Sequence, residues 1–243
     1  MTSPTAHAPL TAPPQQQPVL RHLALIPDGN RRWARAKNLP TTEGHRRGGE
    51  RCLDVLQWCS EYPEIETVSL AVCSIENLAR RPEVETRAFA RVITELIRQT
   101  AATRRWRINL MGNPDMFGPA VSEVLHEAVT ATADVSGPVA NFAVAYSGRD
   151  ELLQAVNQLM RASTTKQSAV SAHDIERHLD TAGQPDCDLM IRTAGVAGLC
   201  GFMPWQGTYS QQYVSATDWP EFAESDLARA VASYHSQERR MGG

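Results

Sequence analysis

Six apolar runs alternate with six segments of helical periodicity along most of this 243-residue chain. Short apolar runs are typical of buried strands, and longer segments with apolar residues every three or four positions are typical of amphipathic helices. The expected strands lie at about 23 to 27, 67 to 73, 107 to 111, 139 to 146, 188 to 192 and 212 to 215. The expected helices lie at about 44 to 61, 83 to 104, 115 to 134, 149 to 163, 171 to 180 and 224 to 240. This alternation predicts an α/β fold, with a mainly parallel six-stranded sheet flanked by helices in a single domain over residues 21–243.

The composition argues against several classes of protein. The net charge of −3 gives no global positive field to attract nucleic acid. No apolar stretch approaches the roughly 20 residues that span a bilayer, so we expect no transmembrane segment. The five cysteines are odd in number and form no Cys-x-x-Cys pair, which favours free thiols in a reducing cytoplasm over disulfides or zinc. Residues 1–20 are rich in Pro and Gln and lack the features of a signal peptide, so we expect a disordered N-terminal tail.

The stretch from His22 to Trp33, HLALIPDGNRRW, joins an apolar strand to a polar turn and a basic helix. Gly29 permits a turn that a Cβ would obstruct, and the helix that follows begins with unpaired N–H groups beside two arginines. Such a helix start suits a phosphate or diphosphate, and Asp28 in the same turn suits the Mg²⁺ that usually accompanies one. An ordinary strand-turn-helix with a solvated basic face is the alternative on these residues alone.

Four polar or aromatic residues fall at the ends of predicted strands. In a parallel sheet, ligands bind beyond the carboxyl ends of the strands, so we expect these residues to share one rim. They are Asp28, Ser74, Tyr146 and Arg192.

The long helix expected at 83–104 has apolar residues at helical spacing. We interpret this stripe as core packing in preference to the lining of a lipid tunnel. The stripe includes Val84, Ala88, Val92 and Leu96.

Several segments, in the same order along the chain, resemble the cis-prenyltransferase family, the undecaprenyl diphosphate synthase-like enzymes. Besides the stretch at 22–33 they are SIENLARRP at 74–82, DLMIRTAG at 188–195, FMPWQ at 202–206, WPEF at 219–222 and RRMGG at 239–243. The resemblance implies transfer of an allylic prenyl group. In that reaction Mg²⁺ and basic residues help the diphosphate leave, an allylic cation-like centre develops, and a neighbouring double bond attacks it.

The resemblance also implies roles for individual residues. Asp28 would hold Mg²⁺ in catalysis, and the allylic diphosphate would be cradled by Gly29, Asn30, Arg31 and Arg32, with Trp33 bracing the turn. His45 would contact the phosphate or deliver a proton to it, although a lone histidine is more often a surface residue. A loop over the reacting centre would contain Ser74, Glu76 and the catalytic Asn77, and the basic residue after it would be Arg80 or Arg81.

The acceptor segment departs from the family pattern. The family's Arg-Thr-Gly-Gly-Glu-x-Arg-x-Ser-Asn-Phe, which binds isopentenyl diphosphate, appears here as RTAGVAGLCGF from Arg192 to Phe202. Arg192 remains, but the Glu, the second Arg and the Ser of the pattern are replaced by Val196, Gly198 and Cys200. A further family Glu, which helps to place Mg²⁺ across the dimer, is replaced by Gln211. The usual acceptor should therefore bind poorly, because it loses a bidentate arginine contact.

A similar loss of residues from the acceptor segment is a feature of the family branch that makes irregular, lavandulyl-type skeletons. Our leading hypothesis is therefore a prenyl diphosphate synthase that couples dimethylallyl diphosphate head to middle with geranyl or dimethylallyl diphosphate, giving a branched C10 to C15 diphosphate. The alternatives are ordinary short-chain cis elongation with isopentenyl diphosphate and a non-catalytic partner subunit. Val72, where long-chain members tend to carry Ala, predicts a short product. The resemblance also implies a homodimer, in which the tail from Arg239 to Gly243 reaches the partner's acceptor site.

Overall fold

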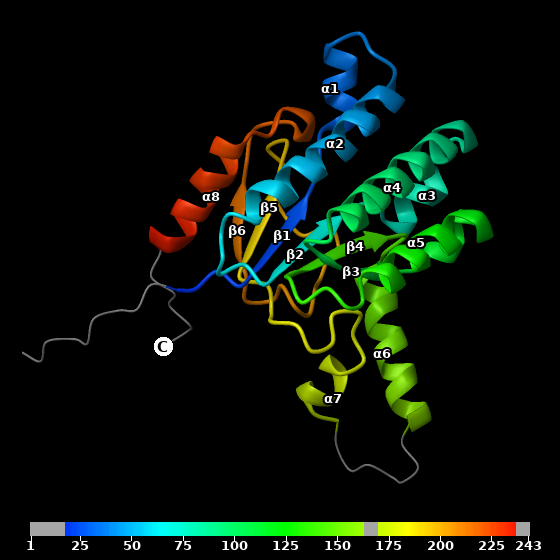
Figure 1. Ribbon diagram of the computed structural model, residues 1–243, viewed down its shortest axis with the longest axis vertical. Coiled ribbons are helices and arrows are strands. Elements are labelled where there is room, and N and C mark those ends of the chain that lie inside the picture. Colours follow the sequence, from blue (N-terminus) through cyan, green and yellow to red (C-terminus); the bar gives the residue numbers. More distant parts are fainter. Residues whose placement is uncertain (1–17, 163–169, 237–243) are drawn as a thin grey trace, which may run out of the picture.

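The computed structural model describes residues 18–162 and 170–236. Within them, six parallel strands form one sheet in the order β3-β4-β2-β1-β5-β6, which confirms the predicted fold class (Figure 1). The strands are β1 (His22–Ile26), β2 (Thr67–Ala71), β3 (Arg107–Gly112), β4 (Val139–Val144), β5 (Leu189–Arg192) and β6 (Gln211–Val214). The α-helices are α1 (Asn30–Ala36), α2 (Thr41–Cys59), α3 (Ile75–Arg80), α4 (Glu83–Thr103), α5 (Pro119–Ala131), α6 (Gly148–Ala162), α7 (Ala172–Glu176) and α8 (Glu224–Ser236), with 3₁₀ turns η1 (Pro114–Phe117) and η2 (Trp219–Glu221).

The central strand β1 separates two cores, because successive side chains of a strand point to opposite faces of the sheet. Leu23 and Leu25 face the larger core, to which α2, α4, α5 and α8 contribute. Ala24 and Ile26 face a smaller one that includes Phe202 from the acceptor segment. In Figure 1, α6 and α7 lie below the sheet, away from α1 and α2.

A buried polar row crosses the second face of the sheet. His22 in β1 contacts Ser69 in β2, Asn141 in β4 donates to the same Ser69 hydroxyl, and Asn109 in β3 donates to Asn141, each at 2.8 Å. The His22 Nδ1 atom lies 2.8 Å from the carbonyl of Pro185, which can only accept, so Nδ1 carries the hydrogen and Nε2 accepts from Ser69. Burial lowers the pKa of His22 to about 4, so this imidazole is neutral at neutral pH.

The apolar stripe of α4 differs from the one expected. The helix buries Phe89, Ile93, Leu96 and Ile97, whereas Val84 is 69% exposed. The residue that continues the stripe at its N-terminal end is Glu85, which is buried despite its charge. The stripe was misplaced because a glutamate is normally assigned to the solvent side of a helix.

The structure also differs from the prediction at the N-terminal tail and at two helices, α3 and α7. Residues 1–17 of the tail lie outside the described residues, but Leu20 is fully buried and belongs to the core. The helix expected at 171–180 is only the short α7, and the residues 237–240 of the last expected helix lie outside the described part. Residues 75–80, expected as a loop, form α3, because the Ser74 hydroxyl caps the helix by accepting from the backbone N–H of Asn77 at 3.2 Å. None of the described helices combines the length and the apolar character needed to cross a membrane.

Candidate active site

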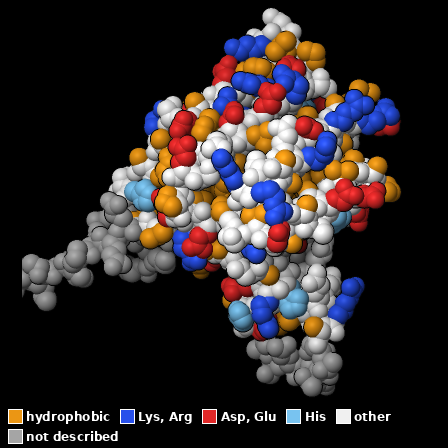
Figure 2. Space-filling model, viewed as in Figure 1, with side chains coloured by type: hydrophobic (Ala, Val, Ile, Leu, Met, Phe, Trp, Pro, Cys, Tyr) orange, Lys and Arg blue, Asp and Glu red, His pale blue; other side chains and the backbone are white. Residues whose placement is uncertain are grey.

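A cavity of about 640 Å³ opens at the carboxyl edge of the sheet. Asp28, Ser74, Tyr146 and Arg192, which follow or end four neighbouring strands, all line it, as the strand-end argument predicts. Ser74 and Tyr146 also pair directly through a parallel bridge. In Figure 2, basic and acidic side chains lie next to one another over the upper part of the molecule, where Figure 1 places α1 and α2.

The turn after β1 brings Gly29, Asn30, Arg31 and Arg32 to the cavity. Gly29 has a φ of +107°, and a Cβ there would lie 2.5 Å from Oδ1 of Asp218. The same Asp218 oxygen accepts from Arg32 Nε at 3.0 Å, so the glycine lets the turn approach the residue that holds Arg32. Trp33 points elsewhere: its indole N–H donates to Glu221 at 3.0 Å, and it is absent from the cavity wall.

Two glycines of α2 bring that helix onto Asn30. A Cβ on Gly44 would lie 2.2 Å from the Asn30 carbonyl oxygen, and a Cβ on Gly48 would lie 2.2 Å from Asn30 Oδ1. Asn30 Nδ2 donates to the Pro27 carbonyl at 3.1 Å, which fixes the side chain within the turn. The close contact between α1 and α2 therefore determines where the first turn presents its polar groups.

The second wall of the cavity comes from α3 and the residue after it. Ser74, Glu76 and Asn77 line the cavity, whereas Arg80 is exposed and lies outside it. Arg81 lines the cavity with its guanidinium 4.5 Å from the ring centre of Phe89. A buried amino group of Arg81 has no hydrogen-bond partner among the described residues, which is costly unless an anion occupies the cavity.

Glu85 lies at the centre of the basic residues of the cavity. Its Oε1 atom is 3.0 Å from His45 Nε2, 3.7 Å from Arg31 Nε and 3.8 Å from Arg81 Nε. Burial opposes ionisation of Glu85, but its three partners outweigh burial and lower the pKa of this carboxyl. Glu85 is therefore a carboxylate, and as such it holds both Arg31 and Arg81 at the cavity.

His45 also lines the cavity, but Glu85 occupies one of its ring nitrogens. Burial is the main cause that lowers the pKa of His45, and Arg81 and Arg31 lower it further, so the ring is neutral at neutral pH. Because ionised Glu85 can only accept, Nε2 carries the hydrogen, and Nδ1 is buried with no partner in the described part of the chain. This arrangement gives His45 no proton directed at a phosphate.

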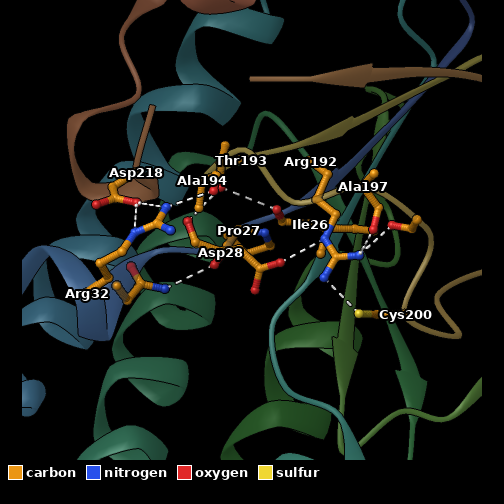
Figure 3. Close-up of polar contacts among 12 residues, drawn as sticks. Ile26, Pro27, Asp28, Arg32, Arg192, Thr193, Ala194, Ala197, Cys200 and Asp218 are labelled. Atoms are coloured by element: carbon orange, nitrogen blue, oxygen red, sulfur yellow. Dashed lines mark hydrogen bonds and ion pairs between the residues drawn. The ribbon is translucent and has the colours of Figure 1, made fainter. Parts of the chain in front are cut away.

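Asp28 and Arg192 form an ion pair across the rim of the cavity (Figure 3). Arg192 Nε donates to Asp28 Oδ2 at 2.8 Å, and the Asp28 side chain remains 39% exposed. Among the described residues, no hydrogen bond reaches the other carboxylate oxygen of Asp28. That oxygen can therefore meet a ligand in the cavity.

The remaining wall of the cavity is apolar. It contains Val72, Phe89, Tyr146 and Phe202, and the rings of Tyr146 and Phe202 meet edge to face at 5.7 Å. The Tyr146 hydroxyl donates to Glu151 at 2.5 Å, so its polar end is satisfied within the protein. The cavity thus combines a cationic end suited to a diphosphate with an apolar end suited to a hydrocarbon chain.

The chain also matches known proteins over most of its length. The family model Prenyltransf, described as "Putative undecaprenyl diphosphate synthase", matches residues 26–242. This chain belongs to the cis-prenyltransferase family. It is thus an enzyme, a prenyltransferase, as its intact first turn indicates.

The relatives of this prenyltransferase include Isoprenyl transferase 1 of Streptomyces avermitilis, 37% identical over 231 residues that make up 92% of this chain and 89% of that protein. The (2Z,6E)-farnesyl diphosphate synthase of Thermobifida fusca is 39% identical over 233 residues, covering 93% of this chain and 91% of the relative. A crystal structure of lavandulyl diphosphate synthase from Lavandula x intermedia, in complex with dimethylallyl diphosphate, superposes with a TM-score of 0.86 at 24% identity and covers 93% of this chain and 99% of that chain. That similarity shows the shared fold.

The sequence argument missed three residues that shape the site of this prenyltransferase. Glu85 and Asp218 hold the arginines, and Glu151 holds Tyr146. Glu85 could have been found, since it stands four residues before Phe89 in the apolar stripe. Glu151 carries the same signal, since it stands four residues before Ala155 in the buried stripe of α6. Asp218 carries none, because Arg32, which it holds, is 186 positions away in the sequence.

Proposed function

We propose that this prenyltransferase joins two short allylic diphosphates head to middle, forming a branched, lavandulyl-type C10 to C15 diphosphate. The observation that carries this proposal is the chemistry of the acceptor segment. Residues 193–202 have no charged side chain, and four hydrogen bonds already engage the guanidinium of Arg192. The segment therefore offers isopentenyl diphosphate neither the second arginine nor the hydroxyl that the family pattern supplies.

The donor half of the cavity supports ionisation of an allylic diphosphate. We assign Arg31 and Arg81 to the leaving diphosphate, together with Asn30, Asn77 of α3 and Ser74, which caps that helix. Positioned cations stabilise the charge that develops as the allylic C–O bond breaks. Glu85 is a positioning residue in this assignment, because it acts through the two arginines.

Magnesium fits the donor set of this turn. The described residues contain no group of three His, Cys, Asp or Glu that could hold a metal by itself. Mg²⁺ is usually bound by one or two carboxylates together with substrate phosphates and water, and Asp28 supplies one such carboxylate. When bound there, Mg²⁺ would neutralise charge on the leaving diphosphate.

The new carbon–carbon bond would form at the apolar end of the cavity. The allylic carbon that loses diphosphate is attacked by the double bond of the second allylic molecule, and a C–H bond of the resulting cation breaks to release one proton. Phe89, Tyr146 and Phe202 exclude water from this step because they form the wall around the hydrocarbon. Val72 limits the length of that wall, which favours short chains.

Ordinary short-chain Z elongation is the second candidate. It is favoured by the names of two relatives, the farnesyl diphosphate synthase of Thermobifida fusca and a "Short-chain Z-isoprenyl diphosphate synthase" of Mycobacterium leprae that is 37% identical over 242 residues. This reaction would need isopentenyl diphosphate as the acceptor.

Product analysis separates the two candidates. The purified protein is incubated with Mg²⁺ and dimethylallyl diphosphate, alone, with geranyl diphosphate and with isopentenyl diphosphate, and the dephosphorylated products are identified by mass spectrometry and NMR. A branched product without isopentenyl diphosphate supports head-to-middle coupling. A linear product with Z double bonds, formed only when isopentenyl diphosphate is present, would replace our proposal by ordinary elongation.

We also propose a reducing compartment such as the cytoplasm. All five cysteines are free, four of them are buried, and Cys200 is exposed. An exposed free thiol beside a substrate cavity is best preserved where thiols stay reduced.

A further inference from the structure

Five arginines line the cavity, and acidic side chains of the protein pair with four of them. Glu85 pairs with Arg31 and Arg81, Asp218 pairs with Arg32, and Asp28 pairs with Arg192. The fifth is Arg35, in the last turn of α1. Its side chain is exposed and makes no hydrogen bond or ion pair with any residue in the described part of the chain. The charge of Arg35 is therefore available to a ligand.

Arg35 lies on the same face of α1 as Arg31, because residues four positions apart in an α-helix are neighbours. Both side chains line the cavity, and Arg31 belongs to its donor half, where its Nε atom is 3.7 Å from Glu85 Oε1. Arg35 follows one turn later, about 5.4 Å along the helix axis. Since its side chain is exposed and also lines the cavity, Arg35 lies at the mouth of the donor half.

The charges of the donor half are not balanced within the described part of the protein. Arg31 and Arg81 share one carboxylate, that of Glu85, and Arg35 adds a third positive charge. Glu76 of α3 also lines the cavity without an ion pair to a described residue, so three arginines stand against two carboxylates. A diphosphate carries several negative charges and is the ligand that such an excess of arginine favours.

The arginines of the donor half differ in how firmly they are held. Glu85 holds Arg31 and Arg81 in place before a ligand arrives, so these two can stabilise the charge that develops as the diphosphate leaves. Arg35 has no such anchor, and a ligand must therefore order its side chain. A contact that is made equally to the bound substrate and to the transition state lowers KM and leaves kcat unchanged.

We propose that Arg35 binds the outer phosphate group of the allylic donor at the mouth of the cavity and thereby sets the affinity of the enzyme for that donor. Arg31 and Arg81 then stabilise the same diphosphate as it leaves. The proposal rests on the donor site proposed above. It does not depend on which carbon of the acceptor reacts or on how the acceptor diphosphate is held.

Calorimetric titration of the full chain with inorganic pyrophosphate in Mg²⁺, together with kcat and KM for the allylic donor, tests this role. For Arg35→Gln we expect the Kd for pyrophosphate and the donor KM to rise by about tenfold, with kcat within about twofold of the wild type. The matched control is Lys37→Gln, which removes the same charge from the end of α1. Lys37 pairs with Glu221 at 3.0 Å and does not line the cavity, so both constants should stay at their wild-type values. Equal constants for Arg35→Gln and the wild type, or an equal rise in the control, would overturn the proposal.

Salt dependence separates the charge of Arg35 from its geometry. A charge at the mouth of a site attracts an anionic substrate, and salt screens that attraction. We expect kcat/KM of Arg35→Gln to fall less steeply with added salt than that of the wild type. Arg35→Lys keeps the charge but loses the planar fork of a guanidinium, so it should recover the salt dependence and only part of the affinity. If the lysine and glutamine variants behave alike in both respects, Arg35 does not act through its charge and the proposal is wrong.

Glu76→Gln distinguishes phosphate binding from an ion pair across the mouth. Removal of this negative charge should not weaken pyrophosphate binding if Arg35 contacts the phosphate itself. A rise in Kd equal to that of Arg35→Gln would show that Arg35 acts by holding Glu76, which would overturn our proposal.

These measurements also separate the role of Arg35 from the proposed function. A wild-type protein that does not bind pyrophosphate would overturn the donor site as a whole. A wild type that binds it as tightly as Arg35→Gln would overturn the role of Arg35 alone. An enzyme that makes only linear products can still show the loss of donor affinity, which would support the role of Arg35 while refuting head-to-middle coupling. Circular dichroism checks that each variant is folded.

Discussion

Three titratable residues show how position determines chemistry in this protein. Glu85 is buried but ionised, because His45 and two arginines surround it. His22 is neutral, because burial lowers the pKa of its imidazole. Asp28 is partly exposed and paired on one oxygen only. The burial and the partners of each side chain differ, and each residue leads to a separate experiment.

Asp28→Ala should remove most of the turnover and leave the fold intact. The side chain is at the rim and contributes little to the core, whereas loss of a group that stabilises the departing diphosphate typically costs about 100-fold or more. Steady-state assays in Mg²⁺, with circular dichroism as a check on folding, measure both effects. The control is Asp134→Ala, which removes a carboxylate that is 73% exposed and pairs with Arg104. Near-normal turnover of a folded Asp28→Ala enzyme would contradict the metal role.

Glu85→Gln should lower kcat by about tenfold or more, because positioned charges lose their effect when they are free to move. The neutral amide no longer anchors Arg31 and Arg81, and it no longer raises the pKa of His45. NMR titration of His45 should therefore give a pKa below that of the wild type. Glu83→Gln is the matched control, since Glu83 is on the same helix with a side chain that is 80% exposed. An unchanged His45 pKa would show that Glu85 does not govern this ring.

His22 should make the protein less stable in mild acid. The unfolded chain binds a proton near pH 6.5, but folded His22 binds it only near pH 4. The unfolded state therefore holds more protons between these values, and the free energy of unfolding should fall by about 3 kcal/mol as the pH decreases from 6.5 to 4. His22→Gln should be less stable at pH 7 but lose less stability over this range, as measured by urea unfolding. Equal losses for both proteins would assign the acid sensitivity to other groups.

At the scale of elements, the contact between α1 and α2 controls the first turn. A glycine to alanine change inside a helix normally stabilises it by about 0.5 to 1 kcal/mol. At Gly48 the added Cβ would collide with Asn30 Oδ1 and lie 3.2 Å from the Trp219 ring. We expect Gly48→Ala to lower both turnover and thermal stability. In the adjacent Gly49→Ala the Cβ would lie 2.5 Å from Cγ1 of Val92, a side chain that does not line the cavity. This variant should therefore lose stability but retain its turnover, and equal losses of turnover in the two variants would rule out a specific effect on Asn30.

The strands were predictable from the sequence because their apolar runs are local. The rim formed by Asp28, Ser74, Tyr146 and Arg192 was predictable as well, since parallel strands end at one edge. The helix at 75–80 was not, because its six residues bury none of their side chains and its main signal is the Ser74 cap. The ion pair between Asp28 and Arg192 and the position of Asp218 depend on contacts between distant segments, which no local pattern encodes.

At the scale of the whole molecule, we expect a homodimer. On the described surface, α6 exposes an apolar stripe in which Leu153, Val156 and Met160 are 61%, 40% and 70% accessible. Such a stripe at helical spacing is typical of a surface that another chain covers. Sedimentation at micromolar concentration should give a dimer for the wild type and for the control Met116→Gln, and a larger share of monomer for Met160→Glu. A wild-type monomer with full activity would contradict this expectation.

The sheet order also has a consequence for synthesis of the protein. The central strand β1 is made early, but its partner β5 follows much later, and Asp28 and Arg192 are 164 positions apart. Contacts between such distant segments form slowly, and an unpaired strand edge promotes association with other chains. A nascent chain therefore keeps one edge of its innermost strand open until most of its residues have been added. The ion pair between Asp28 and Arg192 can form only after β5 has been made and has paired with β1. Catalytic activity should therefore be among the last properties that the growing chain acquires.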